Sequence, residues 1–130
     1  MTDSLNFAGR CLLAAIFLVS GVRKILAFGA VSGMMAGKGF PMPDVVLAAT
    51  IALEILGGLM LIANWQARAA ALALAAFTLV AGAIFHGFWG HFNAPPPQFN
   101  NELNHFLKNV AIVGGLLLVA AGSNDSRARA

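Results

Sequence analysis

Residues 45–63 read VVLAATIALEILGGLMLIA, an apolar stretch in which Glu54 is the only ionisable residue. A helix that crosses the hydrocarbon core of a membrane needs about 20 predominantly apolar residues. Three other stretches have similar length and character, at about residues 7–28, 67–89 and 104–122. Their length and their richness in Leu and Ala favour helices over the short alternating strands of a membrane barrel. The sequence therefore predicts an all-α protein, an integral membrane antiparallel four-helix bundle that forms one domain over residues 1–130 with a frayed polar tail at 123–130.

The overall composition supports a membrane protein. The chain has 130 residues, of which 10% are charged and 59% are hydrophobic, and its mean hydropathy is +0.81. An ordinary soluble domain has roughly 25% charged residues, and a small soluble domain needs more polar surface than this chain supplies. The net charge of +3 comes from basic residues that are scattered rather than clustered, which excludes nucleic acid as a partner. The lipid bilayer is the expected partner.

The predicted connections differ in length. Asn64–Gln66 forms a tight antiparallel turn between the second and third helices. The first connection, at 29–44, is expected to hold a short interfacial helix that Pro41 and Pro43 stop. The third, at 90–103, contains Pro95–Pro97, which predicts an extended excursion.

The first helix is expected to be retained, because Arg23 and Lys24 separate its apolar part from the only small-residue cleavage context. The two sides of the membrane have equal numbers of basic residues if all are counted. When Lys24 and Lys108 are assigned to the membrane interior and left out, the side that holds the termini has more. The remaining basic residues then place both termini in the cytoplasm by the positive-inside rule.

Ionisable residues inside the apolar stretches are candidate functional residues, because a charge in the hydrocarbon costs at least about 2.5–3.5 kcal/mol. At about 1.5 Å per residue, Lys24 lies roughly 6 Å from the end of the first helix and Glu54 roughly 13 Å into the second. His86 lies roughly 5 Å from the end of the third helix and Lys108 roughly 6 Å into the fourth. Antiparallel threading predicts that they share one half of the bilayer. The candidate site consists of catalytic Glu54 and His86 with substrate-binding Ser20, Lys24, Lys108 and Asn109.

Structural interpretations remain open for these residues. Glu54 can serve in a purely structural ion pair, Asn109 in helix–helix hydrogen bonding and Arg23 as a side chain that reaches the interface. His86 and His105 could act as the two axial ligands of a haem, but with one histidine on each of two helices and no matching depth the sequence does not favour a haem site. Glu102 with His105 supplies only half of a di-iron pattern. No flavin or metal site is evident, and Cys11, the single cysteine, is expected to serve in packing.

Several short motifs occur in an order that resembles the DoxX family of small four-helix membrane proteins. The resemblance covers roughly residues 6–121. Its motifs are Gly9-Arg10, Phe17-x-x-Ser20-Gly21-x-x-Lys24, Gly39-Phe40-Pro41, Glu54-x-x-Gly57-Gly58, Phe85-His86-x-Phe88-Trp89, Phe106-x-Lys108-Asn109 and Gly114-Gly115.

This resemblance implies a relation to the small subunit of thiosulfate:quinone oxidoreductase and places the chain in the bacterial inner membrane. The expected function is that of a redox-pathway protein that binds a quinone or a small oxidised or sulfur compound in the periplasmic half of the bundle. It is then a membrane subunit of a quinone-linked oxidoreductase. Because the sequence shows no cofactor site of its own, the electrons are expected to come from a redox partner protein or from the substrate. Two alternatives remain: a small proton-coupled transporter acting as a homo-oligomer, and a non-catalytic membrane assembly subunit.

Overall fold

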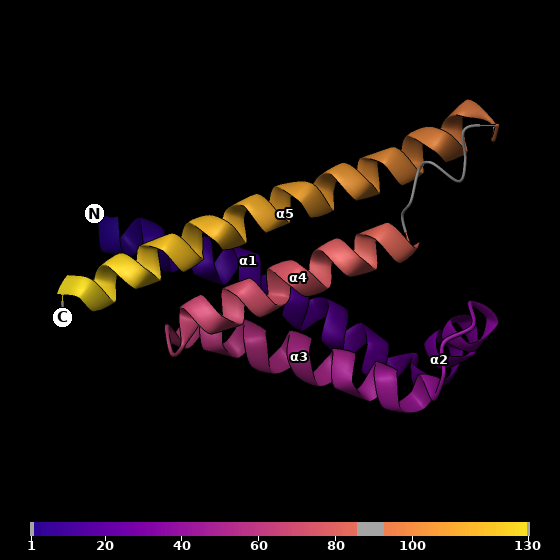
Figure 1. Ribbon diagram of the computed structural model, residues 1–130, viewed down its shortest axis with the longest axis horizontal. Helices are drawn as coiled ribbons and strands as arrows, with labels where there is room; N and C mark the ends of the chain where they lie inside the picture. Colours follow the sequence, from indigo (N-terminus) through magenta and orange to yellow (C-terminus); the bar gives the residue numbers. More distant parts are fainter. Residues whose placement is uncertain (1, 86–92, 130) are drawn as a thin grey trace. The chain divides into compact units, whose positions relative to one another are not determined.

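The computed structural model describes residues 2–85 and 93–129, with side chains described as far as residue 122. In this part of the chain the backbone forms five α-helices and no strand. They are drawn in Figure 1: α1 (Thr2–Leu26), α2 (Phe28–Gly37), α3 (Pro43–Ala63), α4 (Ala67–Phe85) and α5 (Pro96–Arg129). The prediction of an all-α protein is confirmed.

Four of these helices are long and apolar enough to cross a membrane. They are α1, α3, α4 and the part of α5 from Pro96 to Gly122. The ten residues of α2 are too few to span a bilayer, and α2 occupies the position where the sequence predicts a short helix. The four predicted spans are therefore confirmed. The last residues of the third predicted span, 86–89, lie outside the described residues.

Local backbone conformation sets the ends of α2 and α3. Gly39 has a φ of 90°, which glycine adopts without steric cost, and its N–H donates to the carbonyl of Ala36. The helix therefore ends before Pro41 is reached. Pro43 is the first residue of α3, where its missing N–H has no helical acceptor to lose.

The prolines before the last helix act differently from the prediction. Pro95–Pro97 do not form an extended excursion, because α5 begins at Pro96. The N–H groups of Gln98 and Phe99 both donate to the carbonyl of Pro95. Proline is tolerated in the first turn of a helix, where N–H groups lack intrahelical acceptors. The polar tail also differs, since α5 continues to Arg129 rather than ending near residue 122.

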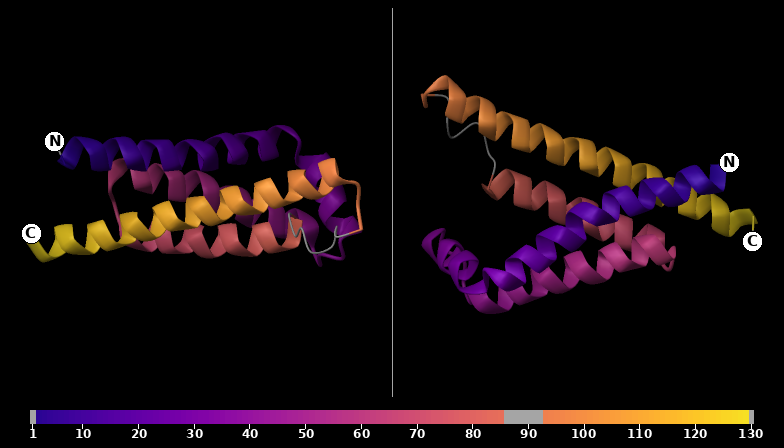
Figure 2. Two further views of the ribbon diagram at one scale, coloured as in Figure 1. Left: turned by 90° about the horizontal axis from the view of Figure 1, so that it is seen from above. Right: turned by 180° about the vertical axis from the view of Figure 1, so that it is seen from behind.

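By its internal contacts the chain divides into two compact units, Met1–Ala70 and Ala71–Ala130. In the first unit α1 packs along α3 (Figure 2). Gly21 lies opposite Ile55 and Gly58 lies opposite Leu18, so residue numbers rise along one helix as they fall along the other. The two helices are therefore antiparallel.

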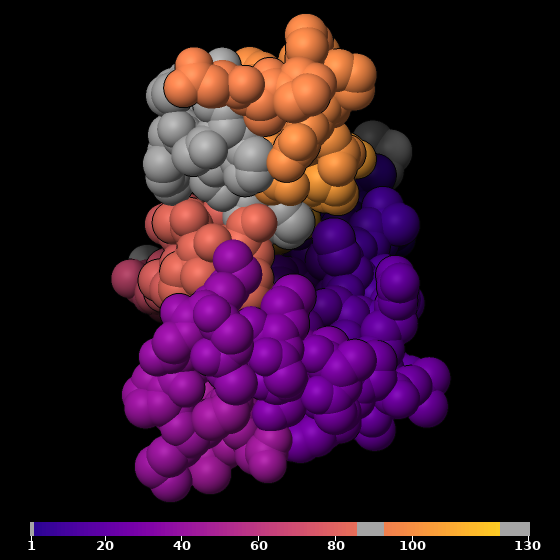
Figure 3. Space-filling view, turned by 90° about the vertical axis from the view of Figure 1, so that its right-hand side faces the viewer, coloured from indigo at the N-terminus to yellow at the C-terminus, as the bar shows by residue number. Residues whose placement is uncertain are grey.

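The two ends of this helix pair are closed by different contacts. At one end the Arg10 Nε donates to the carbonyl of Leu61, 2.9 Å away, in the last turn of α3. At the other end the Ser32 hydroxyl of α2 donates to the carboxylate of Asp44 in the first turn of α3. The space-filling view shows α2 and the segment that leads into α3 covering this second end (Figure 3). These contacts fix the register of α3 against α1 and α2.

The second unit contains most of α4 together with α5, which run antiparallel (Figure 1). Leu74 and Leu116 are fully buried. A methyl group added at Gly82 would lie 2.8 Å from the Asn109 side-chain nitrogen, so α4 and α5 approach closely at this point. Assembly of both units into one bundle stays a prediction.

Close approach of α1 and α3 depends on glycine. A Cβ added at Gly21 would lie 2.7 Å from Ile55 Cγ1, and one at Gly58 would lie 3.0 Å from Leu18 Cγ. Real Cβ atoms do not approach neighbours as closely as the first of these distances. Small residues at such positions allow membrane helices to pack at short range.

We therefore expect Gly21→Ala to destabilise the protein by about 1–3 kcal/mol, the usual cost of overpacking. Gly9→Ala is the matched control in the same helix, because nothing lies within 4 Å of its added Cβ. That control gains up to about 1 kcal/mol of helix propensity. Thermal unfolding in detergent micelles measures both variants, and an equal rise in Tm for the two would contradict the close packing of α1 on α3.

Candidate functional site

The central feature of the first unit is an ion pair between Lys24 of α1 and Glu54 of α3. The Lys24 ammonium donates a hydrogen bond to Glu54 Oε1. The Glu54 side chain is 1% exposed and that of Lys24 is 25% exposed. Both residues belong to helices long and apolar enough to cross a membrane, so the pair places two opposite charges together inside a low-dielectric region.

Helical spacing explains why Glu54 is buried. Counted from Glu54, the other buried residues of α3 lie three, four or seven positions away and form one face of the helix with it; they are Leu47, Gly57, Gly58 and Leu61. The carboxylate therefore occupies a position that packing has already turned toward α1. A charge there without a partner would cost several kcal/mol.

Helical spacing also explains why Lys24 faces Glu54. The buried residues of α1 are Ala14, Phe17 and Gly21, and Lys24 lies one helical turn beyond Gly21. A Cβ added at Gly21 would be 3.7 Å from Glu54 Cβ, so this glycine brings the two helices together next to the carboxylate. The absence of a side chain at residue 21 thus leaves room for the ammonium to reach Glu54.

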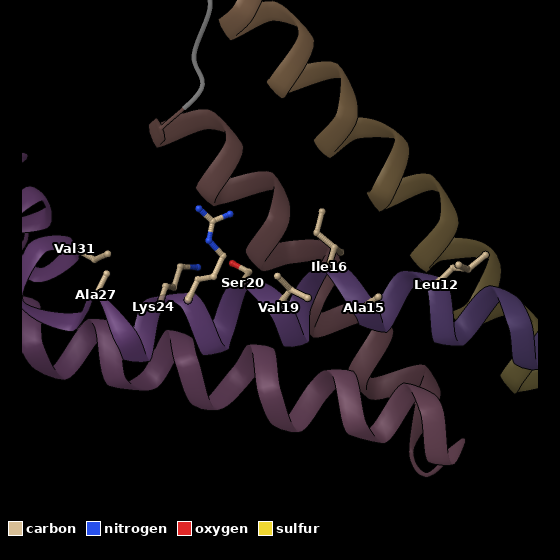
Figure 4. Close-up of a pocket in the computed structure, with 9 residues that line it drawn as sticks. Leu12, Ala15, Ile16, Val19, Ser20, Lys24, Ala27 and Val31 are labelled. Atoms are coloured by element: carbon tan, nitrogen blue, oxygen red, sulfur yellow. The ribbon is translucent and has the colours of Figure 1, made fainter.

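A groove with a volume of about 630 Å³ runs along α1 beside the ion pair. Its polar end contains Ser20, Arg23 and Lys24. The other described residues that line it are Leu12, Ala15, Ile16, Val19, Ala27 and Val31. Figure 4 shows Ser20 and Lys24 projecting on the same side of α1 as the apolar side chains Val19 and Ile16. Lys24 therefore belongs both to the groove and to the buried pair.

The predicted site residues fall into three groups. The structure brings Lys24 and Glu54 into contact and places Ser20 beside Lys24 in the groove. Lys108 and Asn109 belong to the second unit, where Lys108 is exposed and Asn109 lies against Gly82. His86 lies outside the described residues. The convergence of all six residues in one site stays a prediction.

Two residues acquire a place that the sequence did not predict. Arg23, interpreted from sequence as an interfacial anchor, lines the groove. Its spacing of three from Ser20 was the available signal, because residues three apart share a helix face. Asp44 also accepts a hydrogen bond from Ser32, a contact that depends on how α2 folds back and has no local sequence signal.

The charge pair leads to a prediction about stability. Lys24→Met removes the ion pair of the buried Glu54 and should destabilise the protein by about 3–5 kcal/mol, whereas an apolar replacement of both partners is often neutral or stabilising. The double variant Lys24→Met/Glu54→Leu should therefore unfold at a higher temperature than Lys24→Met alone. Thermal unfolding in detergent measures this, with Arg68→Met, an exposed residue, as the control. The single variant Glu54→Leu completes the comparison. If the stability lost by the double variant equals the sum of the losses in Lys24→Met and Glu54→Leu, the two residues are not coupled and the prediction is wrong.

Comparisons with known proteins identify the family of the chain. A family model described as DoxX matches residues 5–87, which include the ion pair and the groove. The matched residues end before Lys108 and Asn109.

Two proteins of Escherichia coli (strain K12) are similar over most of the chain. Inner membrane protein YphA is 29% identical over 111 residues, which cover 85% of this chain and 77% of the relative. Inner membrane protein YqjF is 32% identical over 113 residues, which cover 85% of this chain and 78% of the relative. No solved structure matches the chain. With a family match over more than half of its length and four helices apolar enough to cross a membrane, the chain belongs to the DoxX family of multi-pass membrane proteins.

Proposed function

We propose that this DoxX-family protein resides in the bacterial inner membrane and binds a quinone, or a small oxidised or sulfur compound, beside the Lys24–Glu54 pair. The observation that carries the proposal is the double role of Lys24, which lines an open groove and also pairs with a buried carboxylate. The names of the two bacterial relatives support the inner membrane as its location.

The chemistry of the pair suits an oxygen-bearing ligand. The Lys24 ammonium has three donor hydrogens, so it can donate to a ligand carbonyl or anionic oxygen while still paired with Glu54. The Ser20 hydroxyl, at the same polar end of the groove, is a second donor. Hydrogen bonds from a charged donor contribute about 1.5–3 kcal/mol each, which is enough to select an oxidised, oxygen-bearing compound over an apolar one.

Reduction of a quinone to a quinol takes up two electrons and two protons. In this proposal Lys24, whose side chain is 25% exposed, passes a proton to the ligand oxygen and takes a new proton from water in the groove, while the hydrogen-bonded Glu54 carboxylate stabilises its charged form. Two such transfers supply the two protons. The electrons come from a partner subunit that carries a redox cofactor. His86, Lys108 and Asn109 complete the site when the second unit contributes to it, with His86 as a further proton carrier.

The proposed orientation has both termini in the cytoplasm. The ion pair lies toward the end of α1 that is opposite its N-terminus, so this orientation places the pair in the periplasmic half of the bilayer. It rests on the distribution of basic residues under the positive-inside rule.

Binding of decylubiquinone to the protein in nanodiscs, measured by calorimetry, tests the proposal. The double variant Lys24→Met/Glu54→Leu should bind about 10- to 100-fold more weakly, because it removes charged hydrogen bonds worth about 1.5–3 kcal/mol. Arg68→Met, exposed and outside the groove-lining residues, should bind as the wild type does. A further variant, Lys108→Ala, measures the contribution of the second unit.

If the double variant keeps its fold by circular dichroism and binds decylubiquinone with unchanged affinity, the ligand does not bind beside the Lys24–Glu54 pair. Release of protons on ligand binding that is lost in Glu54→Gln, together with ligand uptake into vesicles and no quinone reduction, would instead favour the proton-coupled transporter.

A further inference from the structure

The groove along α1 has an amphiphilic lining that extends well beyond the ion pair. Its apolar part includes Leu12, Ile16 and Val19, which are 76%, 48% and 58% exposed. Residues 12, 16, 19 and 23 recur at intervals of three or four and therefore form one stripe on the helix surface. This stripe joins a continuous apolar surface to a single arginine.

The charge at the polar end of the groove is unbalanced. The charge of Lys24 is neutralised by Glu54. Among the residues that the structure describes, no carboxylate forms an ion pair with Arg23. The guanidinium therefore leaves the polar end with a net positive charge, and its planar donors match the oxygens of a phosphate.

The position of these groups along α1 matches the layers of a bilayer. Arg23 is in the last turn of α1, about 4.5 Å before the helix ends at Leu26. Leu12 lies roughly 16 Å deeper along the helix axis, which is about half of the 30 Å hydrocarbon core. The Arg23 side chain is thus long enough to reach headgroup level, and the apolar stripe spans the depth of the acyl chains of one leaflet.

We infer that this groove is a binding site for an anionic phospholipid. The Arg23 guanidinium and the Ser20 hydroxyl donate to phosphate oxygens, and one acyl chain lies along Val19, Ile16 and Leu12. A zwitterionic lipid fits less well, because its cationic headgroup brings a second positive charge to Arg23. The inference does not rest on the ligand proposed for the ion pair, although a lipid and that ligand would compete for the Ser20 hydroxyl and for the groove.

Photocrosslinking of the full-length protein in nanodiscs tests the inference. Phosphatidylglycerol and phosphatidylcholine, each with a diazirine on one acyl chain, are compared at equal content in otherwise identical bilayers, and mass spectrometry locates the adducts. Wild-type protein should give phosphatidylglycerol adducts concentrated on residues 12–19 and fewer from phosphatidylcholine. Arg23→Gln should lower the phosphatidylglycerol yield there by about fivefold, since one arginine near an anionic surface contributes about 1 kcal/mol.

Arg68→Gln is the matched control, because Arg68 is also exposed but follows the turn at the other end of α3. It should leave the adducts on residues 12–19 unchanged, which separates a site at Arg23 from general attraction by net charge. Equal yields from both lipids in the wild type, or an unchanged yield in Arg23→Gln with the fold intact, would overturn the inference. Ser20→Ala should give a smaller loss than Arg23→Gln, because it removes a neutral donor.

Discussion

The ion pair between Lys24 and Glu54 joins α1 to α3 where their other buried residues are mainly small or apolar. In a low-dielectric region neither charge is tolerated alone, and the pair is tolerated only if the two helices keep one register. Gly21 and Gly58 permit the helix approach that this register needs. The remaining contacts of the first unit, from Arg10 at one end to Asp44 at the other, are compatible with only this alignment.

This constraint also determines the chemistry of the groove. Because Glu54 neutralises Lys24, the two side chains present a polar but charge-balanced site, which suits a neutral oxygen-bearing ligand and proton exchange. Arg23, one residue away on the helix, has no carboxylate partner among the described residues and gives the groove a positive edge. Two adjacent basic residues thus have different environments, since their side chains point about 100° apart around the helix axis.

Much of the fold was accessible from the sequence, and the errors have physical causes. Four spanning helices follow from long apolar stretches, because the bilayer fixes their minimum length. The prediction of an extended segment at Pro95–Pro97 was wrong, because proline disrupts the interior of a helix but not its first turn. For the site, the depths of Lys24 and Glu54 predicted that they lie in the same membrane half. The spacing of three residues between Ser20 and Arg23 places both on one helix face, but only the folded chain shows that this face lines a groove.

The sequence by itself determined that this chain is an all-α membrane protein with four apolar spans and very few charges within them, because hydrocarbon restricts both backbone and side chains. It also identified Glu54 as a residue that needs a partner. Only the tertiary structure decided that Lys24 is that partner and that the small residues of α1 and α3 lie against each other's side chains. The physical reason is that helix spacing fixes which residues share a face, whereas the pairing of faces depends on side-chain packing between helices distant in sequence.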